Sequence, residues 1–74
     1  MVPASITNRQ RECLRWIAAG KTRKDIAAIL SISYETVREH LENALHRLDC
    51  ATTAQAAVKA YRLGLIDVPG GNFG

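Results

Sequence analysis

Two helix-start signals, separated by one short connection, set the strongest constraint on how this chain can fold. Thr22 is followed three residues later by Asp25, which is the pattern of a capping box, and Ser33 offers a second cap further along. Gly20 ends the preceding segment, because glycine readily adopts the left-handed backbone at a helix end. This order of signals is typical of a helix-turn-helix. Such a unit projects its second helix outward, where it can lie in a DNA groove.

The small size of the chain limits it to one domain with a modest core. Its 74 residues lie near the lower limit for a fold held without disulfides or metals. A hydrophobic fraction of 47% argues against disorder, and an aromatic fraction of only 5% together with frequent alanine indicates closely packed helices. The net charge of +3 has the sign that suits a polyanionic partner, but it is too small to identify one.

Cysteine and histidine usage indicates neither a disulfide framework nor a metal centre. Cys13 and Cys50 are isolated thiols, which we interpret as small buried hydrophobic residues in a reducing cytoplasm. His40 and His46 lie on opposite sides of a helix, so they do not form a set of zinc ligands. No apolar run approaches the length of about 18 residues that a membrane helix needs, and the N-terminus lacks a signal-peptide pattern. We therefore expect a cytoplasmic protein without a metal, a cofactor or a membrane partner.

The segment of about 8–19 is predicted to form the first helix. Thr7 can cap it, and Gln10 completes a capping box three residues on. Apolar residues then recur at helical spacing, which predicts one buried stripe. That stripe comprises Cys13, Leu14, Ile17 and Ala18. A second, shorter helix is predicted over about 23–30, after the cap at Thr22.

The third predicted helix, about 34–48, has the clearest periodicity in the chain. Its apolar stripe comprises Val37, Leu41, Ala44, Leu45 and Leu48. The opposite face is mostly polar and carries Tyr34, Arg38, Glu39, Glu42, Asn43, His46 and Arg47. Because that face cannot belong to the core, it must meet water or a partner.

The fourth predicted helix starts at a cap formed by Thr52 or Thr53 and runs to about Leu63. It is apolar over more of its circumference than one core requires, and an extra apolar face on a small domain often marks a dimer contact. The candidate dimer residues are Ala54, Ala57, Val58 and Tyr61. Residues 68–74, which are rich in glycine, are expected to form a flexible C-terminal tail.

A long series of residues at fixed spacing connects these four segments. It comprises Ile6, Thr7, Arg9, Glu12 and Leu14, then Ala19, Gly20, Lys21, Thr22, Ile26, Ala27, Leu30, Ile32, Ser33, Thr36, Val37, His40 and Leu41, and finally Arg47, Leu48, Gln55, Ala56, Ala60, Gly64, Leu65 and Ile66. Over residues 6–66 the series resembles the LuxR-type (GerE-type) DNA-binding domain. The runs 13–16 and 18–22 are most similar to the C-terminal output domains of quorum-sensing acyl-homoserine-lactone receptors.

This resemblance implies an all-α fold, namely a four-helix LuxR-type helix-turn-helix domain over residues 5–67 with the helix-turn-helix unit at about 22–41. It also implies sequence-specific DNA binding and transcription regulation, with the third helix in the major groove of a two-fold operator. The implied partners are double-stranded DNA, a second copy of the chain bound through the last helix, and RNA polymerase. We do not expect an enzyme, since the chain has no glycine-rich phosphate loop and no nucleophile with a base at workable spacing.

Carried over by position, the DNA-contacting side chains of this family fall on the second and third helices. Arg38, Glu39 and Glu42 occupy positions at which family members present base-reading side chains. Thr22 and Lys24 stand at the start of the second helix, whose first N–H groups point toward a phosphate in this family. The full implied set is Thr22, Lys24, Tyr34, Thr36, Val37, Arg38, Glu39, Glu42 and Asn43.

Departures from the family pattern leave a second interpretation open. Glu42 stands at a usually basic position and Glu39 adds another carboxylate, so residues 34–48 carry two basic and three acidic side chains, a net charge of −1. Carboxylates can accept hydrogen bonds from cytosine amino groups, but they also weaken attraction to phosphates. The alternative is therefore a protein-interaction module of the same fold that has lost its affinity for DNA.

Overall fold

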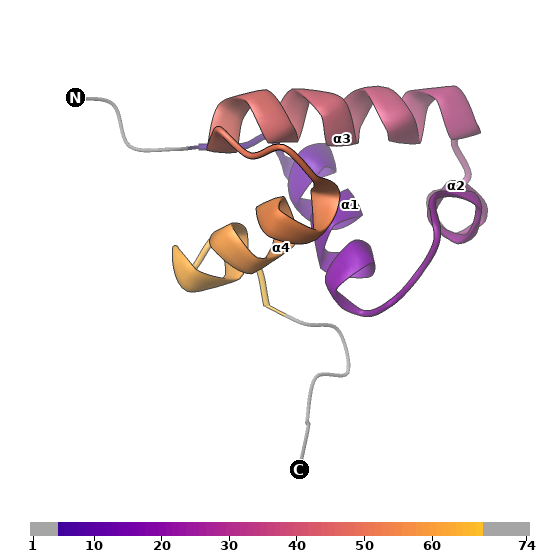
Figure 1. Cartoon of the computed structure of the whole chain (residues 1–74). Helices are drawn as coiled ribbons and strands as arrows, with labels where there is room; N and C mark the ends of the chain where they lie inside the picture. The colour runs from indigo at the N-terminus through magenta and orange to yellow at the C-terminus, as the bar shows by residue number, and fades with distance from the viewer. Residues whose placement is uncertain (1–4, 68–74) are drawn as a thin grey trace, which may run out of the picture.

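The four predicted helices are all present in the computed structural model, which describes residues 5–67 (Figure 1). They are α1 (Asn8–Ala18), α2 (Arg23–Leu30), α3 (Tyr34–Leu48) and α4 (Thr53–Arg62). No strand occurs within residues 5–67, so the expected all-α fold is confirmed. The tail predicted over 68–74 lies outside the described residues. Within residues 5–67, none of the helices has the length and hydrophobicity of a membrane-spanning segment.

Side-chain caps start each helix where the sequence predicts them. The starts of α1, α2 and α4 are capping boxes, each with two reciprocal hydrogen bonds of 3.0–3.3 Å, formed by Thr7 with Gln10, Thr22 with Asp25, and Thr52 with Gln55. For α4 the cap is thus Thr52 and not Thr53. At the start of α3, Ser33 Oγ accepts a hydrogen bond of 3.0 Å from the Thr36 amide. These bonds satisfy amides that the first turn of a helix leaves unpaired, so local chemistry defines where each helix begins.

Left-handed residues end the first three helical segments. Gly20, which follows α1, has a φ of 90°, as predicted for a glycine at a helix end. Ser31 and Asp49 end α2 and α3 with φ values of 57° and 56°, although neither is glycine. Both carry short polar side chains, which tolerate this conformation better than bulky ones. A left-handed residue therefore redirects the backbone both before and after α3.

One core forms where α1 packs against α3 and α4, while α2 packs against α3. The inner stripe of α3 lies within it, since Val37, Leu41, Ala44 and Leu48 are at most 1% exposed. Leu45, also predicted in the stripe, is half-buried at the edge. The other buried hydrophobic side chains are Cys13, Leu14, Ile26, Ala56, Ala57, Ala60 and Ile66. Alanines on α4 let its backbone approach α1 closely, which suits the low aromatic content.

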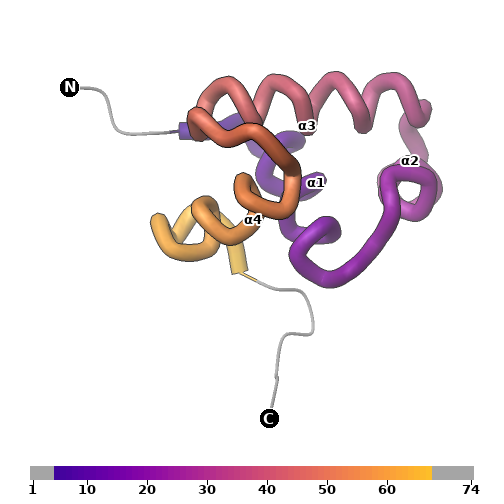
Figure 2. The backbone as a smooth tube through the Cα atoms, viewed as in Figure 1, coloured from indigo at the N-terminus to yellow at the C-terminus, as the bar shows by residue number. Residues whose placement is uncertain are grey.

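The position of α3 determines what the fold presents outward. Figures 1 and 2 show α3 running along one edge of the molecule, with α2 at its N-terminal end and α1 and α4 on one side. The exposed side chains on its other side are Arg38, Glu39, Glu42, Asn43, His46 and Arg47, while His40 at the edge of the core is half-buried. One side of α3 is therefore packed in the core, and the opposite side is open to solvent or a partner.

The two cysteines differ in environment, and both are free thiols. Cys13 is fully buried, as predicted, and this burial raises the pKa of its thiol to about 11. Cys50 is only half-buried, and its Sγ donates to the Leu48 carbonyl oxygen at 3.4 Å. The interpretation as a buried hydrophobic residue is therefore correct for Cys13 and only half correct for Cys50, which lies just past α3 and packs partly buried against the edge of the core.

Replacing Leu41 by alanine should lower the free energy of unfolding by about 2–5 kcal/mol, because the change leaves a cavity at the centre of the inner stripe. Urea denaturation followed by circular dichroism measures this loss. Asn43→Ala, on the exposed side of the same helix, is the control and should change the free energy by less than about 0.5 kcal/mol. Equally small losses in both variants would show that the inner stripe does not anchor α3.

Candidate nucleic-acid interface

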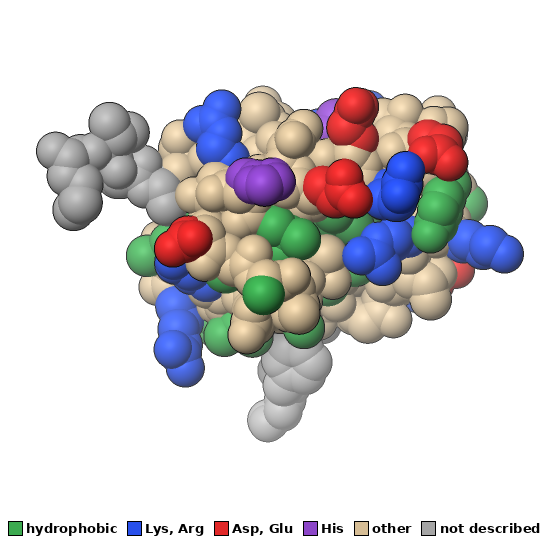
Figure 3. All heavy atoms as spheres, turned by 45° about the horizontal axis from the view of Figure 1, so that its top comes forward, with side chains coloured by type: hydrophobic (Ala, Val, Ile, Leu, Met, Phe, Trp, Pro, Cys, Tyr) green, Lys and Arg blue, Asp and Glu red, His purple; other side chains and the backbone are tan. Residues whose placement is uncertain are grey.

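The outer face of α3 brings most of the implied DNA-contacting side chains together. Arg38, Glu39, Glu42 and Asn43 are exposed, and Tyr34 at the start of the helix is 44% exposed. Figure 3 shows acidic and basic side chains standing side by side on this face, toward its α2 end. The face is thus a mixed-charge surface that is rich in hydrogen-bond donors and acceptors.

Val37 does not belong to this surface. Its side chain is 0% exposed and lies within the core, so it cannot contact DNA and is removed from the candidate set. The physical reason is helical periodicity, which places Val37 above Leu41 on the inner stripe. Thr36, its neighbour, is half-buried, and its Oγ1 lies 2.8 Å from Ser33 Oγ. Thr36 therefore contributes to the cap of α3 and presents only part of its side chain outward.

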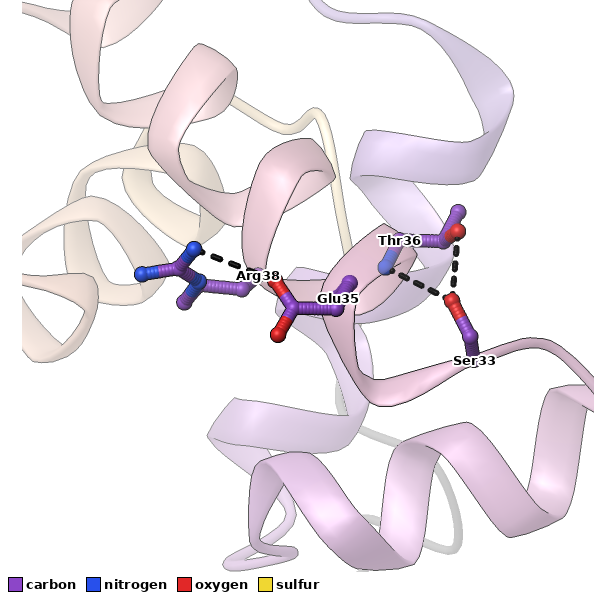
Figure 4. A network of polar contacts seen from close by, with 4 residues as sticks. All are labelled: Ser33, Glu35, Thr36 and Arg38. Carbon is purple, nitrogen blue, oxygen red and sulfur yellow. Dashed lines mark hydrogen bonds and ion pairs between the residues drawn. The ribbon is translucent and has the colours of Figure 1, made fainter.

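Arg38 is held by Glu35, one turn before it. Arg38 Nη2 lies 3.1 Å from Glu35 Oε1, and the two side chains are 53% and 76% exposed. The four-residue spacing to Glu42 would also permit an ion pair on one helix face, but Arg38 pairs with Glu35 at the three-residue spacing. Figure 4 shows Glu35 reaching toward Arg38, while the contact between Ser33 and Thr36 lies at the start of the helix.

A shallow hollow of about 190 Å³ lies along this part of α3. Its lining consists of Glu35, Thr36, Arg38, Glu39 and Glu42. One guanidinium therefore stands among three carboxylates at the centre of the outer face. This arrangement can offer N–H donors to guanine and oxygen acceptors to the amino groups of cytosine or adenine.

The start of α2 supplies the second part of the candidate interface. Lys21, Thr22 and Lys24 are exposed there, and Arg23 is half-buried. The Asp25 carboxylate accepts from the Thr22 amide at 3.0 Å, and this hydrogen bond, together with that from the Thr22 side chain, holds the pKa of Asp25 below its ordinary value of 3.8. The amides of Arg23 and Lys24 take no part in the capping box. They stand at the positive end of the helix dipole, which favours an anion.

The candidate dimer residues on α4 are not equally accessible. Val58 and Tyr61 are 54% and 59% exposed, and Ala54 is also exposed. Ala57 is only 5% exposed, so it belongs to the core and can give a partner little contact area. Ala57 instead forms part of the floor of an apolar hollow of about 490 Å³ between α1 and α4.

Several contacts near these surfaces were missed by reasoning from the sequence. Glu35 could have been found, because it stands three residues before Arg38 on one helix. Leu63, just after α4, is 51% exposed, and its exposure could not be predicted from the apolar pattern of the helix. Lys59 Nζ donates to the Leu48 carbonyl oxygen at 2.6 Å and so ties α4 to the end of α3. No local signal identifies this last contact, because its partners lie in different helices.

Comparison with known proteins agrees with the fold and the arrangement of the helices. Residues 4–60 match the model of the family described as bacterial regulatory proteins, luxR family. The chain is 46% identical over 68 residues to the HTH-type quorum sensing-dependent transcriptional regulator VjbR of Brucella abortus. The aligned residues cover 92% of this chain and 26% of that protein. It is 42% identical over 64 residues to the transcriptional activator protein LuxR of Aliivibrio fischeri. Here the aligned residues cover 86% of this chain and 26% of that protein. The chain thus spans about a quarter of the length of these relatives.

Solved structures show the same four-helix arrangement. The transcription factor GerE superposes with a TM-score of 0.79 at 34% identity, over 84% of this chain and 92% of that one. SdiA of Escherichia coli superposes with a TM-score of 0.80 at 41% identity, over 88% of this chain and 28% of that one. The expected resemblance to a LuxR-type helix-turn-helix domain is confirmed.

Replacing Asp25 by asparagine should destabilise the chain at neutral pH but not in acid. Because the native pKa of Asp25 is depressed, its contribution is complete above the ordinary value of 3.8 and is lost as the pH falls through the native pKa. The difference in unfolding free energy between the two proteins, measured by urea denaturation from about pH 6 to pH 2.5, should therefore shrink in acid. Glu42→Gln controls for the change in net charge. A difference that stays constant with pH would contradict the depressed pKa.

Proposed function

The chain belongs to the luxR family of bacterial regulatory proteins, and on this premise we propose that it binds double-stranded DNA sequence-specifically and regulates transcription. The observation that carries the proposal is the exposed polar face of α3, on a helix capped at Ser33 and packed along its opposite side. An α-helix presented in this way fits the width of the major groove of B-DNA.

Base reading is assigned to the centre of the outer face. Arg38 would donate to guanine O6 and N7, the commonest specific contact of an arginine in the major groove. Glu39 and Glu42 would accept from the amino groups of cytosine or adenine. The exposure of all three side chains and their place around one hollow support this assignment.

Phosphate binding is assigned to the start of α2 and to the flanks of α3. Lys21 and Lys24 are cations near the positive end of a helix dipole, where they disfavour the helix unless an anion lies between them. A DNA phosphate at the Arg23 and Lys24 amides would remove that repulsion. Tyr34, Thr36 and Asn43 would contact the backbone on either side of the bases.

The acidic residues of α3 distinguish this chain from a strongly basic DNA binder. With a net charge of −1 over residues 34–48, α3 gains little from phosphates, so affinity must come largely from base contacts and from α2. The same observation favours the second candidate function, a protein-interaction module that has lost DNA affinity. The dependence of duplex binding on salt separates the two functions, because phosphate contacts release counterions.

Binding as a dimer is part of the proposal. Val58, Tyr61 and Leu63 are large hydrophobic side chains, each more than half exposed, on or just after α4. A second copy packed through a two-fold axis on the face of α4 that carries Val58 and Tyr61 would cover these two side chains and fix the spacing of the two half-sites. Contact with RNA polymerase is a further part of the proposal, as the route by which an activator would act. With DNA and RNA polymerase as partners, the protein would act in the cytoplasm.

The unaltered chain should bind a duplex selected from a randomised pool more tightly than a scrambled duplex, with affinity that falls steeply as salt rises. Fluorescence anisotropy across a salt series measures both effects. Arg38→Ala should cost about 1–3 kcal/mol on the selected duplex and reduce the preference over the scrambled one, because a base contact is lost.

Arg9→Ala on α1 is the matched control for that substitution. Arg9, like Arg38, is an exposed arginine paired to a glutamate three residues away on the same helix, with Glu12 at 2.9 Å. It should leave the preference unchanged. An absence of duplex binding at low salt would reject DNA binding and favour the protein-interaction module.

Val58→Glu should weaken self-association at least about tenfold, or ~1.4 kcal/mol, because it places a charge in an apolar contact. Sedimentation equilibrium of the free chain and of its complex with a two-half-site duplex measures this change. Arg9→Ala, on α1 and outside both proposed surfaces, serves as the control. A chain that stays monomeric at every concentration and on the duplex would exclude α4 as a dimer surface.

A further inference from the structure

The ion pair between Arg38 and Glu35 lies in a hollow that offers the guanidinium two further carboxylates. It places the only cation of the hollow in contact with one particular carboxylate out of three. Glu39 and Glu42 line the same hollow, yet within residues 5–67 the ion pair formed by Arg38 is with Glu35. The guanidinium is therefore held toward the N-terminal end of α3 and away from the other two carboxylates.

Glu35 itself stands on a well-defined part of the backbone. It is the second residue of α3, between the cap at Ser33 and the amide of Thr36 that this cap accepts from. A carboxylate in the first turn is favoured by the helix dipole, so this position retains a negative charge at little cost to the helix. Figure 4 shows the short path from the capped turn through Glu35 to Arg38.

From this geometry we propose that Glu35 is a positioning residue that determines how strictly Arg38 selects its base. The proposal rests on the DNA-binding function proposed above. Glu35 holds the guanidinium in one orientation before DNA arrives, and it does so without contacting a base itself.

The chemistry of the guanidinium permits this double use. An arginine side chain has five N–H donors in a rigid fork, and the pair with Glu35 uses a donor on Nη2. The remaining donors include two that can point in parallel at guanine O6 and N7. Binding then requires less ordering of a long, rotamer-rich side chain, and a base that cannot accept both bonds leaves an already placed donor unsatisfied.

Charge gives a second reason for the same role. A free carboxylate at position 35 would repel the phosphates that flank the groove, whereas a carboxylate paired with Arg38 is locally neutralised. Loss of Glu35 should thus have two separable effects, namely a general gain in attraction to any duplex and a loss of selectivity at the base pair that Arg38 reads. Only the second effect depends on the ion pair.

The experiment starts from the duplex that the unaltered chain selects from a randomised pool. The G·C pair whose preference Arg38→Ala abolishes is identified first, and a twin duplex carries A·T at that position. Dissociation constants for both duplexes are then measured by anisotropy for the unaltered chain, Glu35→Ala, Glu12→Ala, and each of these combined with Arg38→Ala. Glu12→Ala is the matched control, because it likewise breaks an ion pair between an arginine and a glutamate three residues apart, but on α1 and outside the hollow.

Glu35→Ala should lower the ratio of the two dissociation constants about two- to fivefold, the range for an exposed ion pair, while Glu12→Ala leaves this ratio unchanged. In the Arg38→Ala background the Glu35 substitution should no longer alter the ratio. An equal effect of Glu35→Ala on both duplexes, or an effect that persists without Arg38, would overturn the assignment and leave the proposed function intact. Failure of the unaltered chain to bind any duplex would overturn both.

Discussion

The burial of one side of α3 is the interaction on which the rest of the structure depends. Val37, Leu41, Ala44 and Leu48 are at most 1% exposed, and the helix packs against α1, α2 and α4. Successive residues of a helix are rotated by about 100°, so fixing these four side chains fixes the direction of all the others. The polar face is therefore oriented by the core and not by its own contacts. The buried side chains of α3 thus determine which of its polar side chains are available to a partner, although they do not contact the partner themselves.

The helices and their starts were predictable because the signals that define them act over one turn. Thr22 and Asp25 need only each other to begin α2, and the periodicity of α3 needs only the pattern of its own side chains. The same local reasoning also indicated which face of α3 points outward. Where it was wrong, as for Val37, a family position was carried over although the periodicity had already placed that residue inside.

Side-chain partners and depth of burial were less predictable, because they depend on more than one segment. Both i+3 and i+4 spacings allow an ion pair on a helix, and only the side-chain conformations select Glu35 over Glu42 for Arg38. Ala57 looked available on α4 until the packing of α1 showed it covered. The bond from Lys59 to the end of α3 requires two helices to meet, and no pattern within either helix predicts it.

The left-handed residues on both sides of α3 have a consequence for how this fold can evolve. Ser31 and Asp49 are joints of defined geometry, so an insertion or deletion next to them would displace the whole helix. Exposed point substitutions, in contrast, usually alter stability by less than about 0.5 kcal/mol. After a gene duplication, the two copies can therefore accumulate different residues on the outer face of α3 while both remain folded. Mutations that change what the domain recognises can thus be inherited independently of mutations that change its shape.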